Sequence, residues 1–166
     1  MPSWRLWGGL DKLATFVALL GANKLRIVVL HDRASMPHQK LEDLVRQKLI
    51  ERKRVLDFSM FLDESPSEAD IEDLLPKDLY IDTFNEVYAK ELKGITLTAN
   101  ELGAYPRMVE CINQWLKQKG VTLLKDGGFN HYRVAQAILP RLTVDALKAE
   151  DLARFERLFG RINEAL

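Results

Sequence analysis

The stretch LRIVVLHD, residues 25–32, decides the fold class of this chain. Residues 25–30 form a β-branched, almost entirely apolar run, and the polar pair His31 and Asp32 follows directly. Apolar runs of this kind are typical of strands in parallel sheets, because helices cover both faces of such a sheet. The run therefore predicts a buried parallel strand with Asp32 at its carboxyl end.

The segments on either side of this strand alternate between strand and helix. Residues 4–7 predict a short strand, and residues 10–20 carry leucine and valine at helical spacing. Residues 41–49 predict a second amphipathic helix, and residues 55–58 predict a further short strand. The order β-α-β-α-β indicates a parallel, three-layer α/β sheet.

After Ser67 the remaining segments are predominantly helical. Ser67 and Asp70 match a capping box for a short helix that ends near Pro76, which is itself suited to begin the next helix, through about Tyr88. Residues 89–105 are expected to form an irregular connection. Apolar faces predict three further helices, within residues 106–119, 134–139 and 152–162.

The composition fits one soluble globular domain. With 166 residues, of which 47% are apolar, the chain can bury one substantial core. We divide it into an α/β core over residues 1–92 and a helical C-terminal extension over residues 93–166, packed on the same domain. Lys+Arg and Asp+Glu are both 24, so the chain has no net basic field for nucleic acid, and any DNA contact must be local.

Cysteine content and hydropathy exclude other classes of protein. The single cysteine, Cys111, excludes an internal disulfide and a multi-cysteine zinc site, and it fits a reducing cytoplasm. The apolar runs are far shorter than the roughly 20 residues that span a bilayer, and the N-terminus has no signal peptide. We therefore expect a cytoplasmic protein with no membrane contact.

Asp32 is the first candidate for chemistry. Ligands in open α/β sheets bind beyond the carboxyl ends of the strands, and an acid at that position can coordinate Mg²⁺. A solvent-exposed acid that begins a loop fits the position equally well. Position alone leaves both interpretations open.

A second group of acids lies at Asp70, Glu72 and Asp73, preceded by Glu64 and Glu68. On a helix, Asp70 and Asp73 lie on one face, so at least two carboxylates can converge on one cation. Mg²⁺ and Mn²⁺ prefer such oxygen ligands, and a metal pair can clamp the attacking and leaving oxygens of a phosphodiester. An acidic first turn that complements the helix dipole is the common alternative, and the pattern alone favours it.

Residues 129–133, FNHYR, place polar and aromatic side chains at the start of a helix. Arg133 could bind a phosphate through two hydrogen bonds or stabilise a pentacovalent transition state, and His131 could assist proton transfer. A buried, hydrogen-bonded histidine and a surface arginine are the alternative, which the residues alone favour. No GxxxxGK[ST] loop is present, so the chain is not expected to bind ATP.

Four segments, taken in order, carry the most specific pattern. They are GGLDKLATFVALLG (8–21), VVLHD (28–32), ADIEDLLP (69–76) and FNHYRVA (129–135). In their order and their residues, these segments resemble the TOPRIM region of the OLD-family ATP-dependent endonucleases, over nearly the whole chain. The resemblance implies a partial TOPRIM, Rossmann-like parallel sheet flanked by helices, with a helical C-terminal region. It also implies metal-dependent hydrolysis of phosphodiesters in DNA.

The resemblance assigns roles to individual residues. Asp32 matches the first acid of the family's DxD-like motif at a strand end. Asp70, Glu72 and Asp73 match its downstream acidic motif, so these four acids would be the ligands of Mg²⁺ or Mn²⁺. Glu72 and Asp73 are also the expected catalytic acids. Arg133 stands where a basic residue before a helical alanine is typical, which suggests an electrostatic role in catalysis.

The departures from the family pattern lead us to expect an incomplete nuclease. Ala34 stands at the second acid of the DxD motif, no strand with an EG-type turn precedes Trp4, and the ABC-type ATPase domain is missing. We expect a C-terminal fragment that has little activity alone and that docks onto an upstream ATPase/TOPRIM segment or partner chain, or dimerises. A catalytically inactive TOPRIM-like interaction or regulatory module is the alternative.

Overall fold

The computed structural model describes residues 12–22, 25–33, 39–63, 66–103 and 107–166. Two short strands, β1 (Val29–His31) and β2 (Val55–Asp57), form a parallel pair. The strands predicted at residues 25–30 and 55–58 are therefore present, although shorter than expected. The strand expected at residues 4–7 lies outside the described residues. Within those residues the protein is a mixed α/β structure with a small parallel sheet.

The other elements are helices. The α-helices are α1 (Leu13–Ala22), α2 (Gln39–Arg46), α3 (Lys77–Val87), α4 (Ala89–Leu92), α5 (Met108–Gln118), α6 (His131–Ile138) and α7 (Ala149–Ala165). The 3-10 helices are η2 (Arg52–Arg54), η3 (Phe58–Phe61), η4 (Ile71–Leu74), η5 (Ala99–Glu101), η6 (Leu139–Arg141) and η7 (Val144–Ala146). The helices predicted within residues 10–20, 41–49 and 76–88 are confirmed, as are the three expected after residue 105.

The expectation that residues 89–105 form an irregular connection is wrong in part, because α4 and η5 lie there. Thr98 and Glu101 explain η5. The Glu101 carboxylate accepts both the backbone N–H and the hydroxyl of Thr98, at 3.1 and 3.0 Å. This is a capping box with the sequence pattern Thr-x-x-Glu, so the sequence contains a local signal for a helix start at this position.

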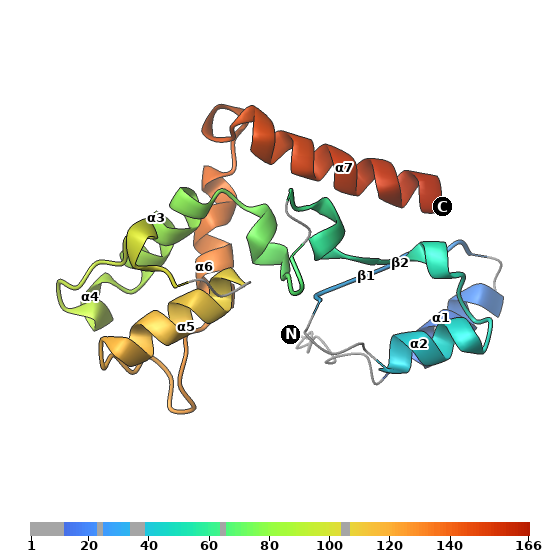
Figure 1. Cartoon of the computed structure of the whole chain (residues 1–166), viewed down its shortest axis with the longest axis horizontal. Coiled ribbons are helices and arrows are strands. Elements are labelled where there is room, and N and C mark those ends of the chain that lie inside the picture. Colours follow the sequence, from blue (N-terminus) through green and yellow to red (C-terminus); the bar gives the residue numbers. More distant parts are fainter. Residues whose placement is uncertain (1–11, 23–24, 34–38, 64–65, 104–106) are drawn as a thin grey trace, which may run out of the picture.

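Helices cover both faces of the strand pair. Val29 and Val55, which lie opposite each other in the sheet, pack into a buried cluster with residues of α1 and α2. Leu30 and Leu56, the next pair, point to the other face and pack in a cluster that includes Leu158 of α7. Figure 1 shows β1 and β2 between α1 and α2 on one side and α7 on the other. Burial on both faces accounts for the continuous apolar run that predicted β1.

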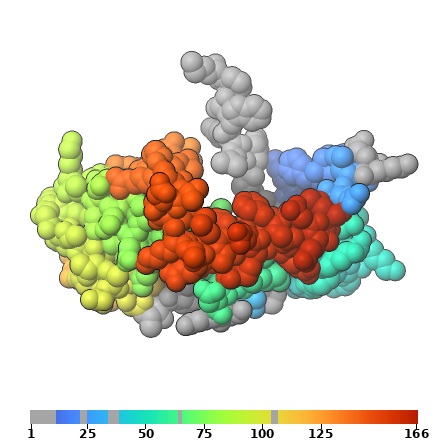
Figure 2. All heavy atoms as spheres, turned by 90° about the horizontal axis from the view of Figure 1, so that it is seen from above, coloured from blue at the N-terminus to red at the C-terminus, as the bar shows by residue number. Residues whose placement is uncertain are grey.

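A second core holds the helical part together. Phe84 of α3 packs edge-on against Phe129 and Trp115, with ring centroids 5.1 and 6.4 Å apart. The buried residues of this core run from Tyr80 to Ile138 and join α3, α5 and α6. The expected boundary after residue 92 therefore passes through this core. In Figure 2, α7 lies lengthwise along one face of the molecule, from the helical part towards the part that contains α1 and α2.

Candidate functional site

The segments that follow β1 and precede η4 pair with each other. Arg33 and Ala69 form an isolated antiparallel bridge, in which each backbone N–H donates to the other residue's carbonyl, at 2.7 and 2.9 Å. Residues that flank such a bridge, here Asp32 and Asp70, lie opposite each other on the two paired segments. The structure thus brings the strand-end acid beside the first acid of the downstream motif.

Asp70 lies in an unusual electrostatic environment. Burial raises the pKa of Asp70 from 3.8 to about 6, the positive charge of Arg107 opposes this rise, and the negative charge of Asp32 adds to it. Arg107 Nη1 lies 3.4 and 3.5 Å from the two Asp70 carboxylate oxygens, and its Nε lies 2.9 Å from Glu68 Oε2. Sequence reasoning did not single out Arg107, because it comes 37 residues later in the chain and belongs to no motif.

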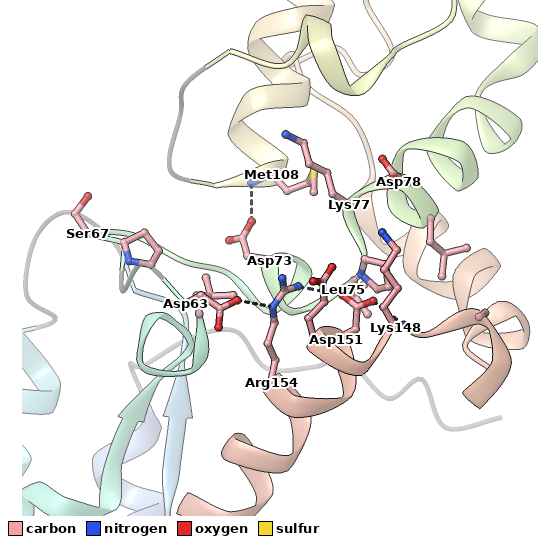
Figure 3. A pocket seen from close by; sticks show the side chains of 16 residues that line it. Asp63, Ser67, Asp73, Leu75, Lys77, Asp78, Met108, Lys148, Asp151 and Arg154 are labelled. Carbon is pink, nitrogen blue, oxygen red and sulfur yellow. Dashed lines mark hydrogen bonds and ion pairs between the residues drawn. The ribbon is translucent and has the colours of Figure 1, made fainter.

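Asp73 ties η4 to the start of α5. Its Oδ2 accepts the backbone N–H of Asp70 at 2.7 Å. Its Oδ1 accepts the backbone N–H of Met108, also at 2.7 Å (Figure 3). The short helix expected to start at Ser67 therefore begins one turn later, with Asp70 as its N-cap residue. The reason is tertiary, since Ala69 is held in extended conformation by its bridge to Arg33.

Glu72 turns towards α6. Its Oε1 lies 2.6 Å from Nδ1 of His131, the first residue of that helix. The Glu72 side chain is 8% exposed, whereas that of His131 is 58% exposed. The hydroxyl of Tyr80 is buried nearby and has no hydrogen-bond partner among the described residues. Burial, together with the charge of Glu72, raises the pKa of that tyrosine. His131, a candidate from the sequence, thus contacts an acid of the motif.

Arg133 makes its contacts elsewhere. Its guanidinium lies over the ring of Tyr88, 4.6 Å from the centroid, donates to the carbonyl of Val87 at 3.3 Å and pairs with Glu91 at 3.3 Å. Residues two apart on a helix point in different directions, so His131 and Arg133 cannot both face the acids. The contacts described for Arg133 are those of a residue that stabilises the end of α3, which fits the surface-arginine alternative.

Asp57, the last residue of β2, is a strand-end acid that the sequence reading did not single out. Its Oδ1 accepts the backbone N–H of Ser59 at 3.1 Å and also the Ser59 hydroxyl, and its Oδ2 lies 3.5 Å from Arg33 Nη1. The signal that pointed to Asp32, an acid directly after an apolar run, was present here too. Asp57 caps η3, so its contacts are structural.

The four expected metal ligands divide into two sets. Asp32 and Asp70 occupy opposite positions beside the bridge between Arg33 and Ala69, whereas Glu72 contacts His131 and Asp73 accepts two backbone N–H groups. Over the part of the chain that the structure describes, no group of three or more His, Cys, Asp or Glu residues is arranged to hold a metal ion. Mg²⁺ often uses only one or two carboxylates and keeps several waters, so Asp32 and Asp70 are the pair that fits it. Ala34 and Glu64 lie outside the described residues.

A cleft of about 1030 Å³ opens beside Asp73, between the first turns of α3 and α7 (Figure 3). Arg154 lies at its wall, 3.2 Å from Asp151 and 3.7 Å from Asp63. Five acids and three basic residues line the cleft: Asp63, Asp73, Asp78, Glu150 and Asp151, with Lys77, Lys148 and Arg154. This excess of acids does not favour the cleft as a binding site for a polyanion.

Comparisons with known proteins identify no relative. No family model matches the chain, and no curated protein or solved structure matches it. Among the described helices, none combines the length and the apolar character needed to cross a membrane. Function must therefore be inferred from the residues and geometry of the site.

Proposed function

We propose that this chain is part of a TOPRIM-type, metal-dependent DNA endonuclease, with a Mg²⁺ or Mn²⁺ site centred on Asp32 and Asp70. The supporting observation is that these two acids lie opposite each other across the bridge between Arg33 and Ala69. Their position at the carboxyl end of a parallel strand pair is the usual place for a ligand in an α/β sheet. Helices on both faces of that pair support a partial Rossmann-like sheet.

The proposal gives the other candidate residues distinct tasks. Asp73 fixes η4 against α5, so that the segment carrying Asp70 is held in place. His131 Nδ1 and Glu72 Oε1, 2.6 Å apart, form a pair that can hold a proton at the edge of the site, with His131 open to solvent. Arg133 has a structural task on α3. A bound divalent cation would supply Lewis-acid activation of the phosphodiester.

Calorimetric titration with Mn²⁺ tests the site directly. The unmodified chain should bind Mn²⁺, and Asp32→Asn or Asp70→Asn should weaken that binding at least about tenfold, because each removes one of two charged ligands. Asp82→Asn, at an exposed position of α3, is the matched control and should leave the affinity unchanged. Absence of Mn²⁺ binding, or binding that neither substitution weakens, would contradict the proposal.

Plasmid nicking tests the reaction. We expect the chain alone to nick weakly in Mn²⁺, because two-metal hydrolysis needs more ligands than Asp32 and Asp70 provide. An upstream ATPase/TOPRIM segment, supplied in the same chain or as a partner, should raise the rate well above this level. Nicking that persists in Asp32→Asn would show that the activity does not come from this site. DNA and the upstream polypeptide, or a second copy of the chain, are the proposed partners.

A catalytically inactive interaction or regulatory module is the second candidate. The observation that favours it is that three acids of the motif already have protein partners: Asp70 has Arg107, Glu72 has His131, and Asp73 has two backbone N–H groups. Carboxylates with such partners often serve structure alone. A chain that binds no Mn²⁺ and is destabilised by loss of these acids would favour this candidate.

A further inference from the structure

Arg107 places a positive charge among the acids of the proposed metal site. It directly precedes α5 and contacts both Glu68 and Asp70. The two acids are largely buried, with side chains 19% and 12% exposed, whereas the Arg107 side chain is 31% exposed. Glu110 also contributes to the negative surroundings of the guanidinium. One guanidinium, more exposed than either acid, therefore lies against two mostly buried carboxylates.

The two contacts of Arg107 differ in closeness. Nε lies 2.9 Å from Glu68 as an ion pair, while Nη1 donates to the two Asp70 oxygens at 3.4 and 3.5 Å. The hydrogen bonds of this guanidinium to a carboxylate are therefore those to Asp70, and they are long.

The charges near Asp70 require compensation. Asp32 lies opposite Asp70 across the bridge, and two neighbouring carboxylates repel each other in a partly buried site. A divalent cation and a guanidinium are alternative ways to offset this repulsion. Both would lie beside the same Asp70 oxygens, so they would compete for one position.

We infer that Arg107 is a built-in counter-ion that occupies the cation position beside Asp70 in the metal-free chain and must leave Asp70 before a divalent metal binds there. This inference rests on the proposed function, because it concerns the same site. It makes metal affinity depend on a residue that is not a metal ligand. Arg107 then keeps the site ordered without metal and lowers its affinity for metal.

Arg107→Gln tests the inference through Mn²⁺ calorimetry and thermal unfolding. Without the competing charge, Mn²⁺ should bind roughly 1.5 to 5 times more tightly, which is the range expected for loss of one partly exposed ion pair. The metal-free variant should unfold at a lower temperature than the unmodified chain, and Mn²⁺ should remove much of this difference. Arg46→Gln, which removes an arginine from an exposed pair with Asp43 on α2, is the control and should change neither quantity.

Each outcome bears on the inference. Tighter Mn²⁺ binding in Arg107→Gln supports it, whether or not the unmodified chain binds measurably. Equal or weaker binding in the variant overturns it, and the proposed site stands if the unmodified chain still binds Mn²⁺ through Asp70. Absence of binding in both chains overturns the inference and the proposed function together. If the glutamine variant does not fold, Arg107→Lys replaces it, because lysine keeps the positive charge but lacks the planar guanidinium. This variant should bind Mn²⁺ more tightly than the unmodified chain, with an affinity between those expected for arginine and glutamine. An affinity no higher than that of the unmodified chain overturns the inference.

Discussion

At the scale of residues, the acids of the segment Asp70 to Asp73 have three different surroundings. Asp70 faces Asp32 and Arg107, Glu72 faces His131, and Asp73 accepts two backbone N–H groups. Successive residues of a tight helical turn point in different directions, so each carboxylate meets a different part of the chain. A charge pattern that looks uniform in the sequence therefore contains acids with separate tasks.

Asp73→Ala should destabilise the chain. It removes the acceptor of two backbone N–H groups, those of Asp70 and Met108, and leaves both donors without their partner. We expect a loss of about 2 to 4 kcal/mol in the free energy of unfolding, measured by chemical denaturation in EDTA. Asp82→Ala, at an exposed position of α3, should lose less than about 0.5 kcal/mol. Equal effects of the two substitutions would show that the Asp73 contacts contribute little.

The raised pKa of Asp70 predicts a pH dependence of stability. Because Asp70 binds its proton more tightly in the folded chain than in the unfolded chain, this group favours folding fully below pH 3.8, and that contribution is lost as pH rises through about 6. Asp70→Asn stays neutral throughout. Relative to the unmodified chain, the variant should therefore gain stability as pH rises across this window in EDTA. A difference in unfolding free energy that is constant with pH, or that shrinks, would contradict this.

At the scale of elements, α7 is the helix that joins the strand pair to η4. Leu158 is buried in the cluster that contains Leu56 of β2 and Leu74 of η4. Arg157, on the neighbouring face, donates to the carbonyl of Phe61 at 2.8 Å. The helix thus covers the second face of the sheet and holds the segment that leads to the candidate site.

Leu158→Ala should show how much this packing contributes. Removal of a buried leucine side chain leaves a cavity, and we expect a loss of roughly 2 to 4 kcal/mol in the free energy of unfolding. Phe159→Ala, the next residue on α7, is a suitable control because Phe159 is 59% exposed, and its loss should cost less than about 1 kcal/mol. Thermal or chemical unfolding of the two variants gives the comparison. A larger effect at Phe159 would show that α7 packs through a different face.

At the scale of the whole molecule, charge balance governs contact with DNA. The chain carries 24 basic and 24 acidic residues, so its net charge gives no general attraction for the phosphate backbone. We expect fluorescence anisotropy with a labelled duplex to show no saturable binding below about 100 µM protein in EDTA. Proteins that bind DNA non-specifically through a basic surface have dissociation constants of about 100 µM or lower, and this chain has no net positive charge. Binding should appear with Mn²⁺ and be lost in Asp32→Asn. Tight binding in EDTA would point to a basic surface unrelated to the proposed metal site.

Local patterns predicted most of the elements, because the signals that define them lie within a few residues of one another. The apolar run at residues 25–30 predicted β1, helical spacing predicted α1, α2 and α5, and Pro76 indicated the start of α3. Two predictions differ from the structure. The capping pair Thr98 and Glu101 starts a 3-10 helix in a segment expected to be irregular. The bridge from Ala69 to Arg33 keeps residue 69 extended, so η4 starts later than the sequence predicted.

By itself, the sequence determined the α/β class, the parallel strand with Asp32 at its end and the acidic segment after it. These features follow from the order of apolar and polar residues, which reflects the periodicity and burial of each element. Only the tertiary structure decided which groups meet. It placed Arg107 rather than Arg133 beside Asp70, and it paired Glu72 with His131, 59 residues away. Partners so far apart are chosen by how the helices pack, and packing depends on the whole core rather than on the residues that finally touch.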